Sequence, residues 1–402
     1  MNRKIIPVIL LMFVNRLGLT ILVPVLPFVV RDYGQSDLVY GLLLSAYSGF
    51  IFFGSPVLGS LSDRFGRKPI LLLSQAGTLA SWFVFGLAWF LPGNVWPLVV
   101  IAISRVVDGI TGGNVSVANA YLSDVTSREE RTRAFTWLIA AGGTALIIGP
   151  PIGSLSSANR LGFLGTAIAA IVISTVTLLA IYFGLNESLP KSERIKKVNL
   201  NPLYQLNMVA KIRDLKNSVS IRRVLTTRVF LSLTLQSYVS IIVLFIIDLF
   251  NFSETDLGFF LLFIGSFLII NQLFVFPIFA RYLNDTAMLL LGLTLTGIGL
   301  WLITLASSIF TFLITYYVLN VGISLAMPTV KSLLTKLSVR QQQGVVMGVD
   351  EGLIALTGAI GPAIAGLLYA QVDRSAFLVF SGVALTGLIL TFISRGAINR
   401  DI

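Results

Sequence analysis

Three ionisable side chains lie inside long apolar runs, where their types and spacing would allow charge and proton chemistry within a membrane. Arg16 is eleven residues into the first run, roughly 17 Å along a helix. Arg105 and Asp108 are three residues apart, so a helix would place both on one face. Charged residues inside a membrane are costly and usually functional. Two interpretations remain open: a structural Arg105–Asp108 ion pair, or an Asp108 that exchanges protons and releases Arg105 or Arg16 to hold an anionic group.

Other polar residues in the apolar runs are candidates for lining a substrate and proton cavity. Asp350 and Glu351 lie about two turns into a late run, where they could couple protons, contact a gate or remain hydrated. Any single polar residue could equally form an interhelical hydrogen bond, worth about 0.6 kcal/mol on average. The further candidates are Asn15, Asn114, Gln236, Tyr238, Asn271, Gln272 and Asn320.

The elements that must position these residues are transmembrane helices. The chain is 55% hydrophobic and 12% charged, about half the charged share of a soluble domain. About 20 apolar residues span a bilayer, and only helices satisfy the backbone of such runs in lipid. The fold class is therefore all-α integral membrane, with twelve transmembrane helices. The expected spans are residues 5–30, 38–61, 69–91, 96–121, 134–156, 161–184, 224–249, 256–278, 287–306, 310–333, 344–369 and 375–394.

The basic residues alternate between segments as the positive-inside rule expects. With the N-terminus inside, most of the 29 Lys and Arg residues fall in cytoplasmic segments, ten of them in the stretch 185–228. Both termini are then cytoplasmic, in a multi-pass protein of a cell membrane, of the bacterial inner or plasma membrane type. The net charge of +11 follows from topology and gives no reason to expect nucleic acid. Because Cys and His are absent, we expect no disulfide, no metal and no cofactor.

The two halves of the chain resemble each other in register. Gly149 and Pro150 of the fifth span recur 212 positions later as Gly361 and Pro362 of the eleventh. Such repeats are typical of transporters built from two homologous bundles. Together with Gly153, these residues predict smooth, kinkable helix segments, with a purely structural kink as the alternative. The predicted domains are pseudo-symmetric six-helix bundles at 1–184 and 224–402, joined by a cytoplasmic linker at 185–223.

Residues 59–68, which read GSLSDRFGRK, form a short charged stretch between two spans. Gly59 would let two helices approach closely, and Gly66 would permit a tight turn. Asp63 is placed to meet the positive end of a neighbouring helix. The alternative is a basic loop that only sets the topology.

Three motifs make the chain resemble the major facilitator superfamily over essentially its whole length. Within that superfamily it is most similar to the drug:proton antiporters of the tetracycline and multidrug efflux type. Residues 59–68 match G-x-x-x-D-R-x-G-R-K at every defined position, and Arg105 matches a fourth-span R-x-x-x-G pattern. Residues 149–153 match the fifth-span antiporter motif, with Ser154 in place of the usual final Gly.

The resemblance implies the major facilitator fold and a gating role for the charged stretch. Asp63 would contact the eleventh helix near Gly344 and latch the cytoplasmic side shut. Arg64 or Arg67 would pair with Asp124, at the cytoplasmic end of the fourth span. The implied gating motif comprises Gly59, Asp63, Arg64, Gly66, Arg67, Lys68 and Asp124.

The first span departs from the efflux pattern. Many relatives read D-x-L-G-x-x-x-x-P-x-x-P there, with an acid that engages protons or cationic drugs. Residues 15–27 of this chain read NRLGLTILVPVLP, so Asn15 replaces the acid and Arg16 adds a positive charge. This weakens a cationic-drug interpretation and favours a neutral, zwitterionic or anionic cargo, with Asp108 taking over the coupling.

The resulting interpretation is a secondary active transporter that works as a monomer by alternating access. It would export a small amphiphilic compound or drug in exchange for protons, through a midplane cavity lined by the first, fourth, seventh and tenth spans. One alternative is an uptake transporter or flippase for an anionic or lipid-like substrate. Another is a non-transporting membrane receptor or scaffold. An enzyme is not expected, because the chain has no His, Cys or nucleotide-binding loop.

Overall fold

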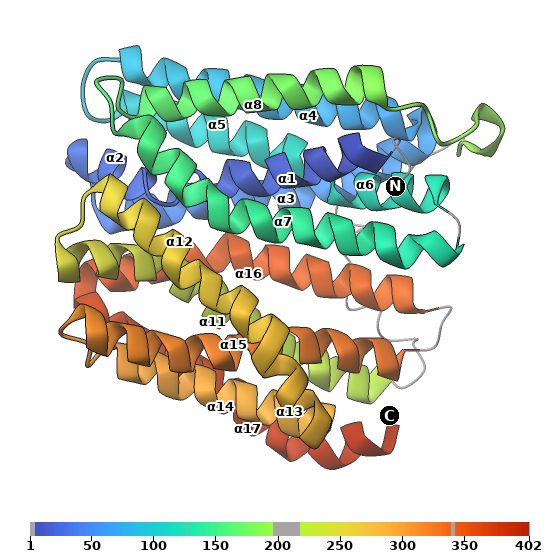
Figure 1. The fold of residues 1–402 in the computed structure, drawn as a ribbon, viewed down its shortest axis with the longest axis vertical. Helices are drawn as coiled ribbons and strands as arrows, with labels where there is room; N and C mark the ends of the chain where they lie inside the picture. Colours follow the sequence, from blue (N-terminus) through green and yellow to red (C-terminus); the bar gives the residue numbers. More distant parts are fainter. Residues whose placement is uncertain (1–4, 127, 196–217, 339–341, 402) are drawn as a thin grey trace. The chain divides into compact units, whose positions relative to one another are not determined.

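The computed structural model describes residues 5–126, 128–195, 218–338 and 342–401, and all regular secondary structure in these ranges is helical (Figure 1). The chain divides into two compact units. Unit 1 comprises Met1–Leu206 with Phe252–Leu262, and unit 2 comprises Asn207–Asn251 with Phe263–Ile402. The helices before the division are α1 (Ile6–Thr20), α2 (Leu26–Asp32), α3 (Asp37–Phe65), α4 (Arg67–Leu87), α5 (Trp96–Gly112), α6 (Val115–Val125), α7 (Arg128–Ser157) and α8 (Phe163–Gly184). Those after it are α11 (Ser218–Phe250), α12 (Glu254–Ile270), α13 (Phe276–Tyr282), α14 (Asp285–Ile303), α15 (Ile309–Leu337), α16 (Gln343–Val372) and α17 (Ala376–Asp401).

Each of the twelve expected spans contains a helix in the structure. Among the described residues, nine helical stretches are long and apolar enough to cross a membrane. One of them, Gln343–Arg400, contains the last two expected spans, α16 and α17, joined by the short 3₁₀ turn Asp373–Ser375. The first expected span corresponds to α1 with α2, and the fifth to α7, which runs through Pro150 and Pro151.

Helix pairings repeat between the two halves of the chain. α1 packs against α7 and α8, and α11 packs in the same way against α16 and α17. α4 packs against α5 and α8, and α14 packs likewise against α15 and α17. Equivalent helices of the two halves therefore meet equivalent neighbours.

Three spans that the sequence predicts as continuous are interrupted. The first breaks after Thr20, where Pro24 and Pro27 remove backbone donors, before α2 begins at Leu26. The fourth breaks between α5 and α6 at Gly113 and Asn114. The eighth passes through the π-helical turn Asn271–Val275 between α12 and α13. Such irregular backbone is tolerated at membrane depth where protein or a cavity surrounds it.

The charged stretch at residues 59–68 is not a loop, which corrects the expected boundaries. α3 continues to Phe65 and α4 begins at Arg67, so only Gly66 separates the two helices. Gly66 has φ +106°, and a Cβ there would overlap the Glu187 carboxylate. A side chain would be strained on both counts.

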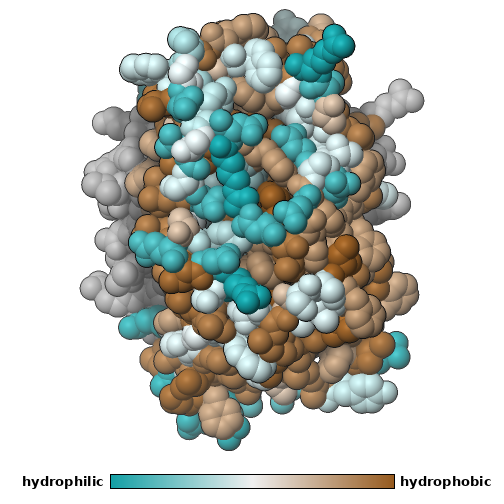
Figure 2. Space-filling model, turned by 90° about the vertical axis from the view of Figure 1, so that its left-hand side faces the viewer, coloured by the Kyte–Doolittle hydropathy of each residue, from teal (hydrophilic) through white to brown (hydrophobic). Residues whose placement is uncertain are grey.

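The face shown in Figure 2 lies at the left-hand side of Figure 1, where several connections between helices are drawn. Hydrophilic residues gather over much of this face, while hydrophobic residues dominate its lower part. Arg31 and Asp37, which flank the connection between α2 and α3, form an ion pair of 3.1 Å. Polar helix ends of this kind suit the aqueous side of a membrane protein.

Candidate functional site

Arg105 and Asp108 form a buried ion pair on α5. Arg105 Nη1 lies 3.4 Å from Asp108 Oδ2, and the two side chains are only 3% and 4% exposed. The guanidinium stands over the ring of Trp82 at 4.9 Å and over that of Phe85 at 5.6 Å. These aromatic faces of α4 attract the cation and fix its position. The spacing of three residues thus produces the pair that the sequence suggests.

Hydroxyl groups surround the Asp108 carboxyl. Thr78 and Ser81 lie beside it on α4. A Cβ built on Gly112 would lie 3.8 Å from the Tyr47 hydroxyl and 3.9 Å from Asp108 Oδ1. Hydroxyls can donate to a carboxylate or accept from a carboxylic acid, so this environment can solvate both protonation states. Tyr47 was not predicted as a site residue, because nothing in its spacing along α3 distinguishes it.

Arg16 is an exposed cation on α1. Its Cγ would lie 3.4 Å from a Cβ on Gly142 of α7. Within the described part of the chain, its side chain makes no ion pair or hydrogen bond. Its charge acts on the Tyr47 hydroxyl, as do those of Arg105 and Asp108. The structure therefore brings the three predicted charges to one region of unit 1, but only Arg105 and Asp108 pair.

Asn15 and Asn114 belong to an interhelical hydrogen-bond chain. Asn15 Nδ2 donates to Asn114 Oδ1, and Asn114 Nδ2 donates to Ser74 Oγ. Ser74 Oγ in turn donates to the carbonyl of Thr111. The chain ties α1 and α4 to the break between α5 and α6. Asn15 is thus a neutral bridge between helices.

A second buried ion pair lies in unit 2, between α11 and α16. Arg228 Nε lies 2.8 Å from Asp350 Oδ1, Nη2 donates to Oδ2 at 3.4 Å, and the side chains are 3% and 0% exposed. Arg228 Nη1 also contacts Met327 Sδ at 3.1 Å. This corrects the charge count above, which placed Arg228 in the cytoplasmic stretch. Nothing in the sequence indicated that Arg228 is buried, because this residue lies next to a basic segment whose charges are expected to be cytoplasmic.

Glu351 and Gln272 do not share the buried setting of their neighbours in sequence. Glu351 is exposed and pairs with Lys331 at 3.2 Å, while Asp350 beside it is buried. Gln272 is exposed, whereas Asn271 is buried. Adjacent residues on a helix point in different directions, so each pair divides between two environments.

Polar residues of α11, α15 and the π-helical turn form a second hydrogen-bond chain. Asn271 Nδ2 donates to Asn320 Oδ1 at 3.2 Å, and Asn320 Nδ2 donates to the Tyr316 hydroxyl at 3.4 Å. The Tyr316 hydroxyl interacts with that of Tyr238. Gln236 is half-buried on the same helix as Tyr238. π-Helical turns are frequent at functional sites, so this chain is a candidate wall of a substrate path.

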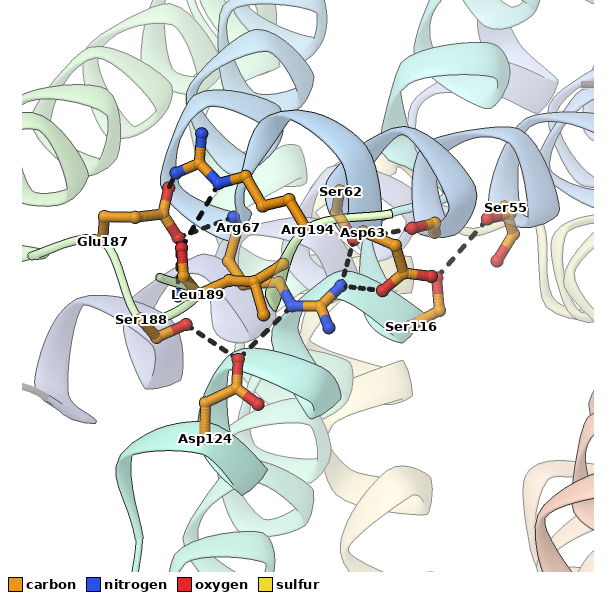
Figure 3. Close-up of polar contacts among 11 residues, drawn as sticks. Ser55, Ser62, Asp63, Arg67, Ser116, Asp124, Glu187, Ser188, Leu189 and Arg194 are labelled. Carbon is orange, nitrogen blue, oxygen red and sulfur yellow. Dashed lines mark hydrogen bonds and ion pairs between the residues drawn. The ribbon is translucent and has the colours of Figure 1, made fainter. Parts of the chain in front are cut away.

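Figure 3 shows Arg67 between two carboxylates at the junction of α3 and α4. Arg67 Nη1 lies 2.5 Å from Asp63 Oδ1, and Nε lies 3.3 Å from Asp124 Oδ2 at the end of α6. Nη1 also donates to Ser62 Oγ at 2.6 Å. Arg67, of the two arginines considered for Asp124, is the one that meets it. Arg64 is exposed and stands over the Phe65 ring at 5.0 Å.

The segment after α8 completes this charge network, which the sequence analysis missed. Glu187 Oε1 accepts from the Arg67 backbone at 2.9 Å, and Glu187 Oε2 lies 3.5 Å from Arg194 Nη2 (Figure 3). Ser188 donates to Asp124 at 2.9 Å, and Lys68 donates to the Tyr182 carbonyl at 2.9 Å. Nothing in the residue pattern at 185–195 indicates this folding back. The contact expected between Asp63 and the eleventh helix stays a prediction.

The glycines of the Gly-Pro segments are sites of close helix contact. A Cβ on Gly149 would overlap the Thr20 side chain, and one on Gly153 would overlap the Ile21 carbonyl oxygen. A Cβ on Gly361 would come within 3.0 Å of Ser237 Oγ. Gly59 is less crowded, since its Cβ would lie 3.3 Å from Ser116 Oγ. Pro150 and Pro362 lie inside continuous helices, so neither proline ends its helix.

Comparison with known proteins identifies the family. The Major Facilitator Superfamily model matches residues 8–287 and 230–400. The chain belongs to the Major Facilitator Superfamily. It is a multi-pass membrane protein and a secondary transporter, not an enzyme, and its relatives share its full length. It is 30% identical to the class C tetracycline resistance protein of Escherichia coli, over 99% of this chain and 98% of that protein.

Two further comparisons show which known proteins this Major Facilitator Superfamily transporter is similar to. It is 28% identical to Multidrug resistance protein 2 of Bacillus subtilis (strain 168), over 98% of this chain and 96% of that protein. A bacterial homologue of the human lysosomal transporter Spinster, crystallised in an inward-facing and unoccupied conformation, has the same fold. It superposes with a TM-score of 0.79 at 12% identity, over 99% of this chain and 97% of that one.

Proposed function

We propose that this transporter exports a small amphiphilic compound in exchange for protons, with Asp108 as the proton-carrying group. The observation that carries the proposal is the buried Arg105–Asp108 pair, 3.4 Å apart, with the hydroxyls of Thr78 and Ser81 nearby. Relatives named for tetracycline and multidrug resistance, at 30% and 28% identity, support the direction and the cargo class. We place the protein in a bacterial inner membrane as a monomer, with both termini cytoplasmic.

Protonation of Asp108 would act by removing the negative charge that balances Arg105 in unit 1. A neutral Asp108 no longer compensates Arg105, while its carboxyl can still donate or accept hydrogen bonds. A proton or a ligand shifts a conformational equilibrium only by its differential affinity for the two states. Asp108 can therefore drive alternating access if its proton affinity differs between the two arrangements of the helices.

The Arg67 network would form part of the gate. Arg67 joins α3 and α4 to α6 through Asp63 and Asp124. Asp63 is 41% exposed, so this carboxylate remains accessible to a second partner. Asp63→Asn should abolish transport while leaving the purified protein folded. Unchanged transport would contradict the gating role, and loss of transport would exclude a receptor or scaffold that moves no substrate.

The coupling is tested in proteoliposomes with a set of fluorescent amphiphilic dyes that are uncharged, zwitterionic or anionic. Wild type should accumulate at least one dye when a pH gradient is imposed. Asp108→Asn should lose gradient-driven accumulation but retain exchange of labelled for unlabelled dye. Glu193→Gln is the matched control, since Glu193 is an exposed acid outside the helical spans. Gradient-driven accumulation by Asp108→Asn would reject Asp108 as the proton carrier.

A further inference from the structure

The first helix of each half carries one arginine that faces the Gly-Pro helix of that half. Arg16 on α1 lies beside Gly142 of α7, and Arg228 on α11 meets Asp350 of α16. The two arginines are 212 positions apart, the same offset that relates the two Gly-Pro pairs. The chain therefore offers an internal comparison between two arginines on equivalent helices.

Among the described residues, an acid neutralises only one of these two arginines. Arg228 is 3% exposed and its guanidinium contacts both oxygens of Asp350. The residue 212 positions before Asp350 is Leu138 on α7, so the acid has no counterpart in the first half. Arg16 is exposed and, within the described ranges, has no ion pair or side-chain hydrogen bond.

A guanidinium without an ion pair in a membrane-spanning run, such as that of Arg16, needs a ligand or water to solvate its charge. A charged side chain within a membrane is retained where it faces a cavity or a partner, because lipid does not solvate it. Asp108, whose charge acts on Tyr47 as that of Arg16 does, is already paired with Arg105. Gly142 has no side chain, so the Arg16 stem packs closely against α7, where a Cβ would lie 3.4 Å from Arg16 Cγ. Asn15, next to it, is held by Asn114 and adds no negative charge.

We propose that Arg16 binds an anionic group of the transported compound, such as a carboxylate, phosphate or sulfonate. The proposal rests on the function proposed above, since it names the charge of the same cargo. The guanidinium presents several donors in a planar fork, which suits such oxyanions. Because Arg16 and Asp108 are separate groups, cargo and proton are linked through the conformational equilibrium rather than by competition for one side chain.

The test measures binding without any gradient, on full-length protein in nanodiscs of zwitterionic lipid. The probe is a naphthalene sulfonate, and its control is the uncharged sulfonamide of the same ring system. Wild type should bind the sulfonate more tightly than the sulfonamide. Arg16→Gln should weaken sulfonate binding by about tenfold or more, because a charge-assisted hydrogen bond is lost, and should leave sulfonamide binding unchanged.

Two further variants separate charge from structure. Arg16→Lys should keep part of the sulfonate preference, because the positive charge remains. Arg160→Gln removes an exposed arginine outside the spans and should change neither affinity. Equal losses for both probes in Arg16→Gln would show a merely structural role and overturn the proposal. A wild type without preference for the sulfonate would overturn it as well.

The source of the anionic group is distinguished in a second set of nanodiscs that contain phosphatidylglycerol. Competition between this lipid and the sulfonate in wild type, absent in Arg16→Gln, would assign the site to a lipid headgroup. Undiminished sulfonate binding would assign it to a soluble amphiphile. Arg16-dependent binding without gradient-driven transport would reject the proposed export and leave this inference standing. Gradient-driven transport that is unchanged in Arg16→Gln would support the proposed export and overturn the inference about Arg16.

Discussion

In the part of the chain that the structure describes, each unit holds one buried arginine–aspartate pair, but the two pairs are built differently. Arg105 and Asp108 lie on one helix, 3.4 Å apart, with the guanidinium held by aromatic rings. Arg228 and Asp350 come from two helices, with a closest approach of 2.8 Å. A pair within one helix can lose its charge without separating any helices, whereas a pair between helices cross-links them. The first therefore suits a group that changes protonation, and the second suits a structural tie.

The largest expected effect is on stability, from breaking the tie between α11 and α16. Asp350→Asn leaves Arg228 charged and buried, which typically costs about 3–5 kcal/mol. The double variant Arg228→Met with Asp350→Leu should recover most of this loss, since apolar replacement of a buried pair is often neutral. Unfolding in detergent titrations measures both. A stable Asp350→Asn would show that the pair is not a structural tie.

Asp108→Asn should destabilise the protein less than Asp350→Asn. The asparagine oxygen can still accept a hydrogen bond from Arg105, and the Trp82 and Phe85 rings continue to stabilise the guanidinium. We expect a loss of about 1.5–3 kcal/mol, of the order of one hydrogen bond to a charged group. The same unfolding titration provides the measurement. Equal losses for the two variants would remove the contrast between the pairs.

The helix contacts at the glycines should also differ between the units. In Gly153→Ala the new methyl group would meet the Ile21 carbonyl, a backbone atom that cannot rotate away. Overpacking of this kind costs about 1–3 kcal/mol. In Gly361→Ala the nearest atom is the Ser237 hydroxyl at 3.0 Å, which can rotate, so the loss should be smaller. Thermal unfolding of the two variants side by side tests the order, and a reversed order would contradict it.

The smallest effect is expected at Glu351, the sequence neighbour of Asp350. Glu351 and Lys331 are 62% and 57% exposed, so their ion pair is screened by solvent. Exposed pairs contribute about 0–1 kcal/mol, so Glu351→Gln should leave the free energy of unfolding within that range. Compared with Asp350→Asn, it shows whether burial, rather than charge alone, sets the cost. A large loss in Glu351→Gln would mean that the acid has another buried partner.

Much of the fold was predictable because the bilayer restricts the choices. Runs of about 20 apolar residues must form helices, and charge alternation places them in order. Each of the twelve expected spans contains a helix in the structure. The breaks contain polar residues, Asn114 in one and Asn271 with Gln272 in the π-helical turn, but these residue types do not by themselves interrupt a helix, so the breaks were not predictable. They depend on neighbouring helices that satisfy the freed backbone groups.

The candidate site, too, was predictable from the sequence in one part and not in another. The Arg105–Asp108 pair follows from a spacing of three residues, because both ends of the contact lie on one helix. The Arg228–Asp350 pair joins residues 122 positions apart, and local pattern carries no sign of it.

The residue types and their periodicity therefore settle that this chain spans a membrane as a bundle of helices, since water and lipid act on each segment separately. Contacts between distant helices decide which charged side chains are buried, which form ion pairs and which do not. For that reason Arg16 has no partner among the described residues and Arg228 is neutralised, although both are arginines in apolar runs.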